Sequence, residues 1–342
     1  MGQSRNLILA DCNPDEISTF LSGCESASGL SFEIVSSVSN LYHGTLWRRL
    51  KRYLSYFYFP FSVFLKRHDI ATVVGWQQFH AINFAFFCRL FKVKPGIKTV
   101  AVNFTYKPKS GIVGYLYRRY MSYAVSSPYM YRLHVLSHAY AVDMSREFGI
   151  DLSRFIVTPF GTPDNYESWK NLGCPEQDFV LALGRSNRNF DLLVKIWRHP
   201  LLQSSRLIII SDTWNPSEAL PSNIVHLNNV RGDDSLPYIS NCVMSVVPLV
   251  DARLCSGDTV LLNSMMMHKP VIISAPSTLA EMYIDDGVNG VYISDDVETS
   301  ARKIAGVLND PAAYQFLARN ARSSYLKRFS RYSMGENIMN AF

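Results

Sequence analysis

Short apolar stretches typical of strands alternate with helix-like segments along both halves of the chain, and this alternation limits the folds it can adopt. The strand-like stretches of the first half are "NLILADC", "LSFEIVSS", "DIATVVGW", "IKTVAVNFTY", "LHVLS" and "RFIVTPFG". Those of the second half are "DFVLALG", "RLIIISD", "NIVHLNNV", "MSVVPLV", "PVIIS" and "GVYIS". Strands that alternate with helices at this spacing form parallel sheets covered on both faces. Each half therefore predicts a Rossmann-like α/β domain.

The length supports two domains, because 342 residues exceed what one hydrophobic core usually holds. We expect an N-terminal domain over residues 1–162 and a C-terminal domain over residues 163–325. Residues 326–342 are expected to form a helix that packs back toward the first domain. Two such domains would face each other across a cleft at the carboxyl ends of their strands.

Composition indicates a globular, cytosolic protein. Hydrophobic residues make up 48% of the chain and charged residues 18%, which excludes a disordered chain. The six cysteines have no C-x-x-C pair and no Cys/His spacing of a metal site, as expected of scattered reduced thiols. The N-terminus enters "NLILADC" without a signal-peptide pattern. We therefore expect no metal and a cytoplasmic location.

The positive charge lies in the first half. Residues 1–160 hold 18 of the 34 Lys and Arg against 9 of the 28 Asp and Glu, leaving 16 against 19 for the second half. Between Ile34 and Val142 the only acidic residue is Asp69. Such a field attracts nucleic acid, an anionic membrane or a phosphorylated acceptor. No nucleic-acid recognition motif accompanies it, so we do not expect a nucleic-acid partner.

The segment "TLWRRLKRYLSYFYF" from Thr45 to Phe59 predicts an amphipathic helix. At about 100° per residue, its apolar side chains share one face and its basic side chains the opposite one. The apolar face holds Leu46, Trp47, Leu50, Tyr53, Leu54 and Phe57, and the basic face holds Arg48, Arg49, Lys51 and Arg52. Such a helix can lie at a membrane interface, or it can be a core helix with a solvated basic face. The apolar run "YLSYFYFPFSVFL", which overlaps the end of this segment, is only 13 residues long and contains Pro60, so it is too short to span a membrane.

The stretch "SGDTVLLNSMMMHKPVIIS" contains a small polar turn, residues 256–259, before a helix and a strand. Asp258 or Thr259 can cap that helix. The turn can also hold an anion, since a helix start offers free N–H groups and Ser256 and Gly257 allow close backbone approach. A position after the strand "MSVVPLV", at the predicted cleft, favours a phosphate site.

A second candidate anion site is the loop in "LALGRSNRNFDLL". A buried strand ends at Gly184, and Arg185 and Arg188 follow before the next helix. Two guanidinium groups at a strand end suit a diphosphate. Alternatively, both arginines are solvated or pair with Asp191.

These segments resemble the GT-B fold glycosyltransferases, and within them glycosyltransferase family 4, the group 1 glycosyl transferases. The resemblance rests on "VLALGRSNRNFDLLVKIW", "VVPLVDARLCSGDTVLLNSMMMHKPVIISAPSTLAEMYIDDGVNGVYIS", "ETSARKIAGVLNDPAAYQFLARNARSSYLKRFS" and "LHVLSHAYAVDMSREFGIDLSRFIVTPFG". It implies two Rossmann-like domains across a cleft. It also implies a transferase that moves a sugar from a UDP- or GDP-sugar to an acceptor hydroxyl, retaining the anomeric configuration without a metal or cofactor.

The resemblance also implies roles for residues of the second half. Arg185 and Arg188 would neutralise the leaving diphosphate, a form of electrostatic stabilisation. Asp258 would act beside the donor sugar, because the family's two glutamates are replaced here by Cys255 and Asn263. The implied donor-binding residues are Gly184, Val230, Arg231, Cys255, Ser256, Gly257, Thr259, Val260 and Asn263.

Acceptor residues are expected in the first half. The family's histidine after the strand "VAVNFTY" is replaced here by Asn103 and Phe104, and His80 is the nearest histidine candidate unless it is packed in the core. The acceptor-side candidates are His80, Trp76, Asn103 and Lys107. With the basic helix, they predict a lipid-linked saccharide acceptor in bacterial surface polysaccharide synthesis and an enzyme bound peripherally to the inner membrane face. The alternatives are a nucleotide-sugar epimerase of the same fold and a non-catalytic nucleotide-sugar-binding subunit.

Overall fold

The computed structural model describes residues 4–37, 46–254 and 256–342. Two compact units form, one of Met1–Phe160 with Arg331–Phe342 and the other of Gly161–Ser330. The first boundary falls two residues before the expected one. Residues 326–330, which we expected in the final helix, belong to the second unit.

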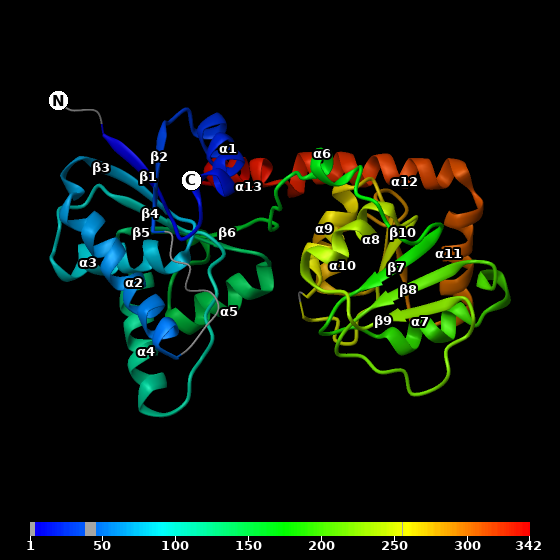
Figure 1. Ribbon diagram of the computed structural model, residues 1–342. Coiled ribbons are helices and arrows are strands. Elements are labelled where there is room, and N and C mark those ends of the chain that lie inside the picture. Colours follow the sequence, from blue (N-terminus) through cyan, green and yellow to red (C-terminus); the bar gives the residue numbers. More distant parts are fainter. Residues whose placement is uncertain (1–3, 38–45, 255) are drawn as a thin grey trace. The chain divides into compact units, whose positions relative to one another are not determined.

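The first unit is built on a six-stranded parallel sheet with the order β2-β1-β3-β4-β5-β6 (Figure 1). The strands are β1 (Arg5–Ala10), β2 (Phe32–Ser36), β3 (Ile70–Gly75), β4 (Lys98–Ala101), β5 (Met130–Val135) and β6 (Phe155–Val157). The helices are α1 (Ser18–Ser28), α2 (Leu46–Leu65), α3 (Gln78–Leu90), α4 (Gly111–Val125), α5 (His138–Phe148) and α13 (Arg331–Asn340). The predicted parallel sheet is confirmed, whereas α4 is a helix that the strand–helix alternation did not indicate.

Helices cover both faces of this sheet because alternate strand residues point to opposite sides. Leu7 and Leu9 of β1 belong to a core shared with α2, α3, α4 and α5. Ile8 and Ala10 of the same strand belong to a second core with α1 and α13. Close packing of α13 on α1 requires a glycine, because a Cβ on Gly23 would collide with the carbonyl of Tyr332.

Helix α2 presents its apolar side chains to solvent over its first three turns. Trp47, Leu50, Tyr53, Leu54, Phe57 and Tyr58 are all exposed. Only near the end of α2 do apolar side chains enter the core, where Val63 and Phe64 are buried. The helix continues through Pro60 to Leu65. A core helix with only its basic face solvated is therefore the wrong description for residues 47–58.

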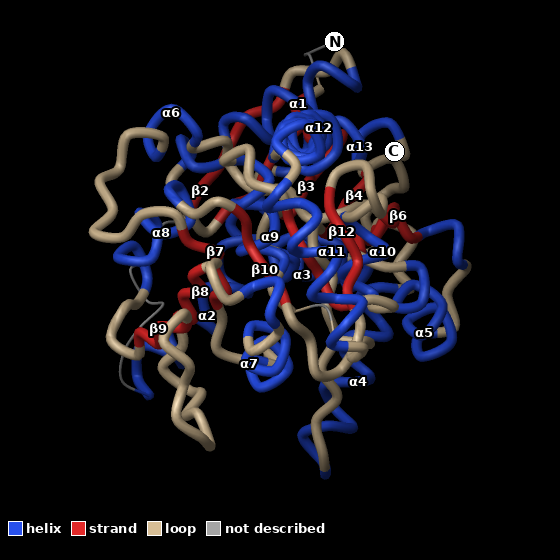
Figure 2. Tube along the Cα trace, turned by 90° about the vertical axis from the view of Figure 1, so that its right-hand side faces the viewer, coloured by secondary structure: helices blue, strands red, loops and turns tan. Residues whose placement is uncertain are grey.

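The second unit has its own six-stranded parallel sheet, with the order β12-β11-β10-β7-β8-β9. The strands are β7 (Phe179–Leu183), β8 (Arg206–Ile210), β9 (Ile224–Leu227), β10 (Met244–Val247), β11 (Val271–Ser274) and β12 (Gly290–Ile293). The helices are α6 (Tyr166–Trp169), α7 (Phe190–Trp197), α8 (Leu236–Asn241), α9 (Asp258–Met266), α10 (Thr278–Tyr283), α11 (Val297–Asn309) and α12 (Pro311–Ser324). Figure 2 shows the strands of this unit lying among helices, as predicted for a buried parallel sheet.

In the second unit, too, side chains that alternate along a strand divide the hydrophobic core between the two faces of the sheet. Val180 and Ala182 of β7 pack with α7 and α11. Leu181 of the same strand is also buried and faces the other side, where α9 packs on β10 and β11. Helix α9 is thus held directly under the sheet, with its first turn just beyond the end of β10.

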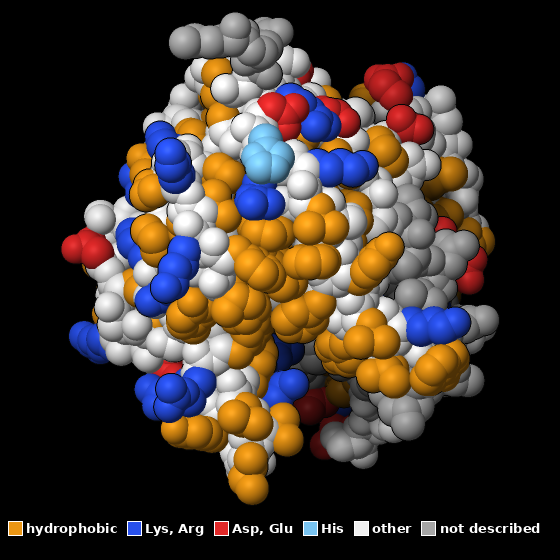
Figure 3. Space-filling view, turned by 90° about the vertical axis from the view of Figure 1, so that its left-hand side faces the viewer, with side chains coloured by type: hydrophobic (Ala, Val, Ile, Leu, Met, Phe, Trp, Pro, Cys, Tyr) orange, Lys and Arg blue, Asp and Glu red, His pale blue; other side chains and the backbone are white. Residues whose placement is uncertain are grey.

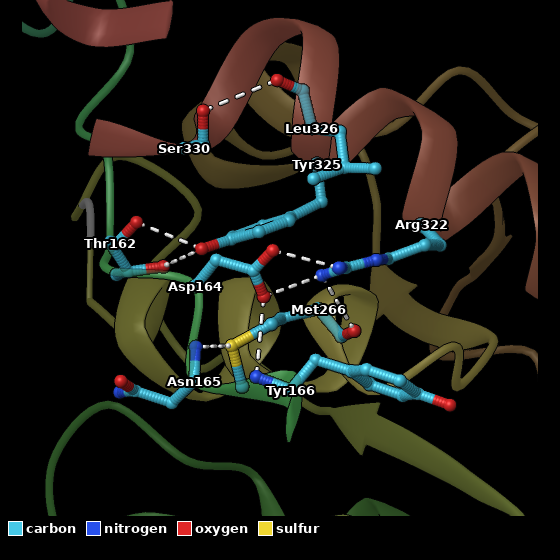
Figure 4. A network of polar contacts seen from close by, with 9 residues as sticks. All are labelled: Thr162, Asp164, Asn165, Tyr166, Met266, Arg322, Tyr325, Leu326 and Ser330. Atoms are coloured by element: carbon cyan, nitrogen blue, oxygen red, sulfur yellow. Dashed lines mark hydrogen bonds and ion pairs between the residues drawn. The ribbon is translucent and has the colours of Figure 1, made fainter. Parts of the chain in front are cut away.

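The start of the second unit is tied to its last helical segments (Figure 4). The two carboxylate oxygens of Asp164 accept hydrogen bonds of 2.8 and 2.7 Å from the guanidinium of Arg322. The hydroxyl of Tyr325 donates to the carbonyl of Thr162 at 2.8 Å. Thr162 also pairs with Ser330 in an isolated β-bridge. These contacts explain why residues 326–330 belong to the second unit and why the expected boundaries are displaced.

Candidate functional site

Two loops meet at the carboxyl end of the second unit's sheet. One, residues 184–189, follows β7, and the other, of which residues 248–254 and 256–257 are described, follows the neighbouring strand β10. The side chain of Asn187 donates to the carbonyl of Asp251 at 3.0 Å and accepts from its N–H at 2.7 Å. The N–H of Asn189 donates to the carbonyl of Pro248 at 3.2 Å. The two predicted anion-binding segments are therefore held against each other.

Arg188 lies at the centre of this junction. Its half-buried guanidinium donates to the carbonyls of Leu183 at 3.3 Å, Ser186 at 3.1 Å and Ser256 at 3.1 Å. Burial lowers the pKa of Arg188, and the nearby carboxylate of Asp258 opposes that shift. An arginine remains protonated under these conditions. The site thus contains a fixed positive charge whose contacts are mostly to neutral carbonyls.

Glycines make room for that side chain on both sides. A Cβ on Gly184 would lie 2.5 Å from Nε of Arg188. A Cβ on Gly257 would collide with its guanidinium, and Gly257 also has a left-handed φ of +114°. Side chains other than glycine are therefore disfavoured at Gly257 by both space and backbone conformation.

Helix α9 begins at Asp258, and its N-cap residue is Gly257, with no side-chain cap. The expectation that Asp258 or Thr259 caps the helix is therefore wrong. The carboxylate of Asp258 instead accepts from the N–H of Thr259 at 2.9 Å, within the first turn. Thr259 is exposed, while Val260 and Asn263 are half-buried. Leu262 and Met266, on the same helix, are buried.

Arg185 and Arg231 meet at a carboxylate that the sequence analysis did not identify. Asp212, two residues after β8, accepts from Nε of Arg185 at 2.7 Å and lies 3.1 Å from Nε of Arg231. The Asp212 side chain is only 6% exposed, whereas both arginines are largely in solvent. The pairing of the loop arginines with Asp191 is not found, since Asp191 accepts from the indole N–H of Trp214. Val230, beside Arg231, is half-buried.

An open cavity of about 520 Å³ lies over the two loops. Its lining residues are Arg185, Ser186, Asn187, Arg188, Phe190, Thr213, Trp214, Val250, Asp251, Leu254 and Ser256. It brings Arg185, Arg188 and Ser256 to one surface. Trp214 and Thr213 were not predicted, and their place just after "RLIIISD" was the signal that could have identified them. The predicted residue Cys255 lies outside the described residues.

The acceptor-side candidates lie in the first unit, and His80 is buried there. Its ring packs against Tyr56 and Phe59, with ring centroids 6.0 and 4.8 Å away. Among the described residues, neither ring nitrogen has a hydrogen-bond partner. Burial lowers the pKa of His80 to about 4, although Asp11 opposes the shift. This environment fits the alternative of a packed core histidine.

The other three acceptor-side candidates lie in different surroundings. Trp76 packs on Phe20 with ring centroids 5.0 Å apart. Asn103 has a left-handed φ of +52°, and its backbone N–H donates to Nδ1 of His134 at 3.0 Å. Lys107 is exposed and lines a separate cavity between α2, α3 and α4.

The predicted membrane-binding residues all lie on α2. Trp47 and Lys51 are exposed, and Lys51 lies 5.7 Å from the centre of the Trp47 ring. Arg52 is half-buried, and the side chains of Arg48 and Arg49 lie outside the described part. None of the helices in the described ranges is both long and apolar enough to cross a membrane. Those ranges also contain no cluster of His, Cys, Asp and Glu that could bind a metal.

Comparison with known proteins identifies part of the chain and its fold. Residues 177–310 match the family model described as glycosyl transferases group 1. The glycosyltransferase from Rickettsia africae ESF-5 is a similar solved structure, with 14% identity, a TM-score of 0.59 and coverage of 97% of this chain and 96% of that one. HepE from Anabaena in complex with UDP has 13% identity, a TM-score of 0.59 and coverage of 98% of both chains.

The UDP-GlcNAc 2-epimerase from Methanocaldococcus jannaschii is also similar, with 14% identity, a TM-score of 0.51 and coverage of 95% of this chain and 98% of that one. No curated protein matches the chain in sequence. At these identities the structural likeness shows the fold alone, whereas the family match covers most of the second unit. The chain therefore has the GT-B fold, and within its second unit residues 177–310 match the model of the group 1 glycosyltransferases.

Proposed function

We propose that this protein is a retaining glycosyltransferase that moves a hexose from a nucleotide-diphosphate sugar to an acceptor hydroxyl. The observation that carries the proposal is the junction around Arg188, where a half-buried cation, two glycines and the start of α9 meet at the end of a parallel sheet. The junction lies inside the segment that matches the group 1 glycosyltransferases. UDP is our preferred nucleotide, because HepE of the same fold was solved with UDP and with UDP-glucose.

The donor diphosphate would lie at this junction. Arg188 and the first-turn N–H groups of α9 would neutralise the negative charge that grows on the leaving diphosphate. Neutralising that charge lowers the barrier to breaking the bond between the anomeric carbon and the phosphate oxygen. No metal is required for this step, since fixed positive groups supply the stabilisation.

The remaining donor residues would surround the diphosphate. Asn263, one turn after Thr259 on α9, would hydrogen-bond the ribose, because an amide can both donate and accept. Val230 and Arg231 would lie beside the base. Asp258 is an anion close to Arg188. Its carboxylate would face the donor sugar, because the negatively charged phosphates would repel it.

The acceptor is proposed to be a lipid-linked saccharide of bacterial surface polysaccharide synthesis, reached from the inner face of the membrane. The exposed apolar face of α2 supports this proposal, because apolar side chains beside basic ones suit the membrane interface. The excess of Lys and Arg in the first half favours an anionic surface.

Turnover of radiolabelled UDP- and GDP-sugars in the presence of a bacterial membrane extract tests the proposed function. We expect label to move into the lipid fraction, with release of the nucleoside diphosphate. Interconversion of the free nucleotide-sugar would instead indicate an epimerase. Binding without turnover would indicate a non-catalytic subunit.

Arg188→Ala is expected to weaken UDP binding about tenfold or more. A charge-assisted hydrogen bond to a phosphate is worth roughly 1.5–3 kcal/mol. Arg185→Ala should have the smaller effect, because Arg185 is already paired with Asp212 and must leave it to reach a phosphate. Calorimetry with UDP measures both.

Arg253→Ala is the matched control for these two variants, since Arg253 is 90% exposed and pairs with Asp251 in the neighbouring loop. If the Arg188→Ala and Arg253→Ala proteins bind UDP with equal affinity and have unchanged melting temperatures, the diphosphate does not bind at this junction.

A further inference from the structure

A second cavity, of about 350 Å³, lies wholly within the first unit, between α2, α3, α4 and the loop after β4. Its lining residues are Tyr53, Tyr56, Phe57, Gln78, Phe79, Thr105, Lys107, Lys109, Tyr117 and Tyr120. It lies at the carboxyl ends of β3 and β4, since Gln78 begins the helix after β3 and Thr105 follows β4. Small-molecule sites of α/β domains occur at this edge of the sheet.

Aromatic rings form the walls of this cavity and fix one another. Tyr56 stacks on Phe79 with ring centroids 5.5 Å apart, and Phe57 lies 5.6 Å from Tyr120. The hydroxyl of Tyr120 donates to the side chain of Asn83, which in turn donates to the carbonyl of Tyr56 at 2.6 Å. The walls are therefore apolar and held in place before any ligand binds.

The loop that closes the cavity is also fixed. The N–H of Thr105 donates to the side-chain oxygen of Gln78 at 2.8 Å, and the amide nitrogen of Gln78 donates to the Thr105 hydroxyl at 3.1 Å. Gly114 permits α4 to lie against this loop, because a Cβ there would collide with the carbonyl of Lys109. The two lysines are thus presented on an ordered loop.

Lys107 and Lys109 supply the positive charge of the cavity. Both are exposed, and Nζ of Lys109 lies 4.7 Å from the centre of the Tyr117 ring. No carboxylate in the described part of the chain pairs with either lysine at 4.0 Å or less. Asp69 is the only acidic residue of the sequence between Ile34 and Val142. These cations thus remain available to an anionic ligand.

The helices that form the walls also carry exposed aliphatic side chains. On α2 these are Leu50 and Leu54, on the face that includes Phe57. On the first turns of α4 they are Ile112, Val113 and Leu116, with Ile112 80% exposed. Figure 3 shows hydrophobic side chains gathered over much of this face of the first unit, with Lys and Arg side chains around them. A polar ligand such as a nucleotide would not pack on this aliphatic surface, whereas a hydrocarbon chain would bury it from water.

We propose that this cavity binds the headgroup of a long-chain lipid diphosphate. Lys107 and Lys109 hold the diphosphate, the tyrosine and phenylalanine rings contact the first carbons of the chain, and the aliphatic side chains of α2 and α4 contact the rest. The proposal rests on the proposed function for its role, which is to hold the lipid anchor of the acceptor. It assigns that anchor a site of its own in the first unit.

Binding of farnesyl diphosphate, a water-soluble lipid diphosphate, tests the proposal by calorimetry on the full-length protein. We expect saturable binding to the wild type that is at least tenfold tighter than that of inorganic diphosphate or of farnesol. The double variant Lys107→Gln/Lys109→Gln should lose at least tenfold in affinity for farnesyl diphosphate. The control Lys92→Gln/Lys94→Gln removes the same charge from exposed lysines after α3 and should lose less than twofold.

UDP is titrated into the same proteins, because it separates failure of this proposal from failure of the proposed function. Both double variants should bind UDP as the wild type does, since all four lysines lie in the first unit. Equal losses of farnesyl diphosphate affinity in the two double variants would overturn the proposal in favour of a diffuse charge effect. Inorganic diphosphate, phosphatidylglycerol vesicles or a single-stranded oligonucleotide competing as well as farnesyl diphosphate would overturn it too.

Discussion

Gly257→Val is expected to abolish detectable UDP binding and sugar transfer. Gly257 has a φ of +114°, which a β-branched residue adopts only with strain. Its Cβ would also point into the guanidinium of Arg188, so the substitution would displace the half-buried cation of the site. The loss therefore combines two effects, the filled space and the moved charge, and should exceed that of Arg188→Ala.

Gly287→Val is the matched control, because Gly287 also has a left-handed φ, of +71°, but open space around it. Both variants place a β-branched residue at a positive φ, and a fall in melting temperature is expected for each. Calorimetry with UDP and a transfer assay should then separate them, with Gly287→Val retaining wild-type affinity. A Gly257→Val protein with normal turnover would mean that the turn only starts helix α9.

Much of the architecture could be predicted because buried parallel strands are nearly continuous apolar runs. "DFVLALG" and "PVIIS" correspond to β7 and β11, as the strand-like stretches predicted. Helix α4 was missed because its sequence does not show such a pattern of burial. Its first turns place Ile112, Val113 and Leu116 in solvent, so it lacks the inward-facing apolar periodicity by which a helix is recognised.

The candidate site could be predicted in part. The sequence indicated the two loops, because each follows a strand and carries small or basic residues. It could not indicate that Arg188 turns back onto the carbonyls of its own loop while Arg185 turns to Asp212. Only two residues lie between the two arginines, and their different partners depend on contacts beyond β8 and β10 that a local pattern does not contain.

Replacing Leu50 and Leu54 of α2 with glutamate is expected to reduce binding to anionic phospholipid vesicles at least tenfold. Burial of a leucine in an apolar phase is worth roughly 1.5–3 kcal/mol, and each new carboxylate adds repulsion. The two leucines are 47% and 58% exposed, so the fold should tolerate the change with little shift in melting temperature. Co-sedimentation with vesicles containing phosphatidylglycerol measures the effect.

The control is Leu201→Glu/Leu326→Glu, two leucines of the second unit that are 46% and 44% exposed. It adds the same charge at matched exposure, so a general charge effect would weaken vesicle binding equally in both proteins. Replacing Arg48, Arg49, Lys51 and Arg52 with glutamine should weaken binding in a salt-dependent way, at about 1 kcal/mol per residue. The leucine variant should lose affinity at high salt as well, because its apolar contribution is not screened. If Leu50→Glu/Leu54→Glu binds vesicles like the wild type, the exposed apolar face of α2 does not contact the membrane, and the lipid acceptor must be reached through another surface.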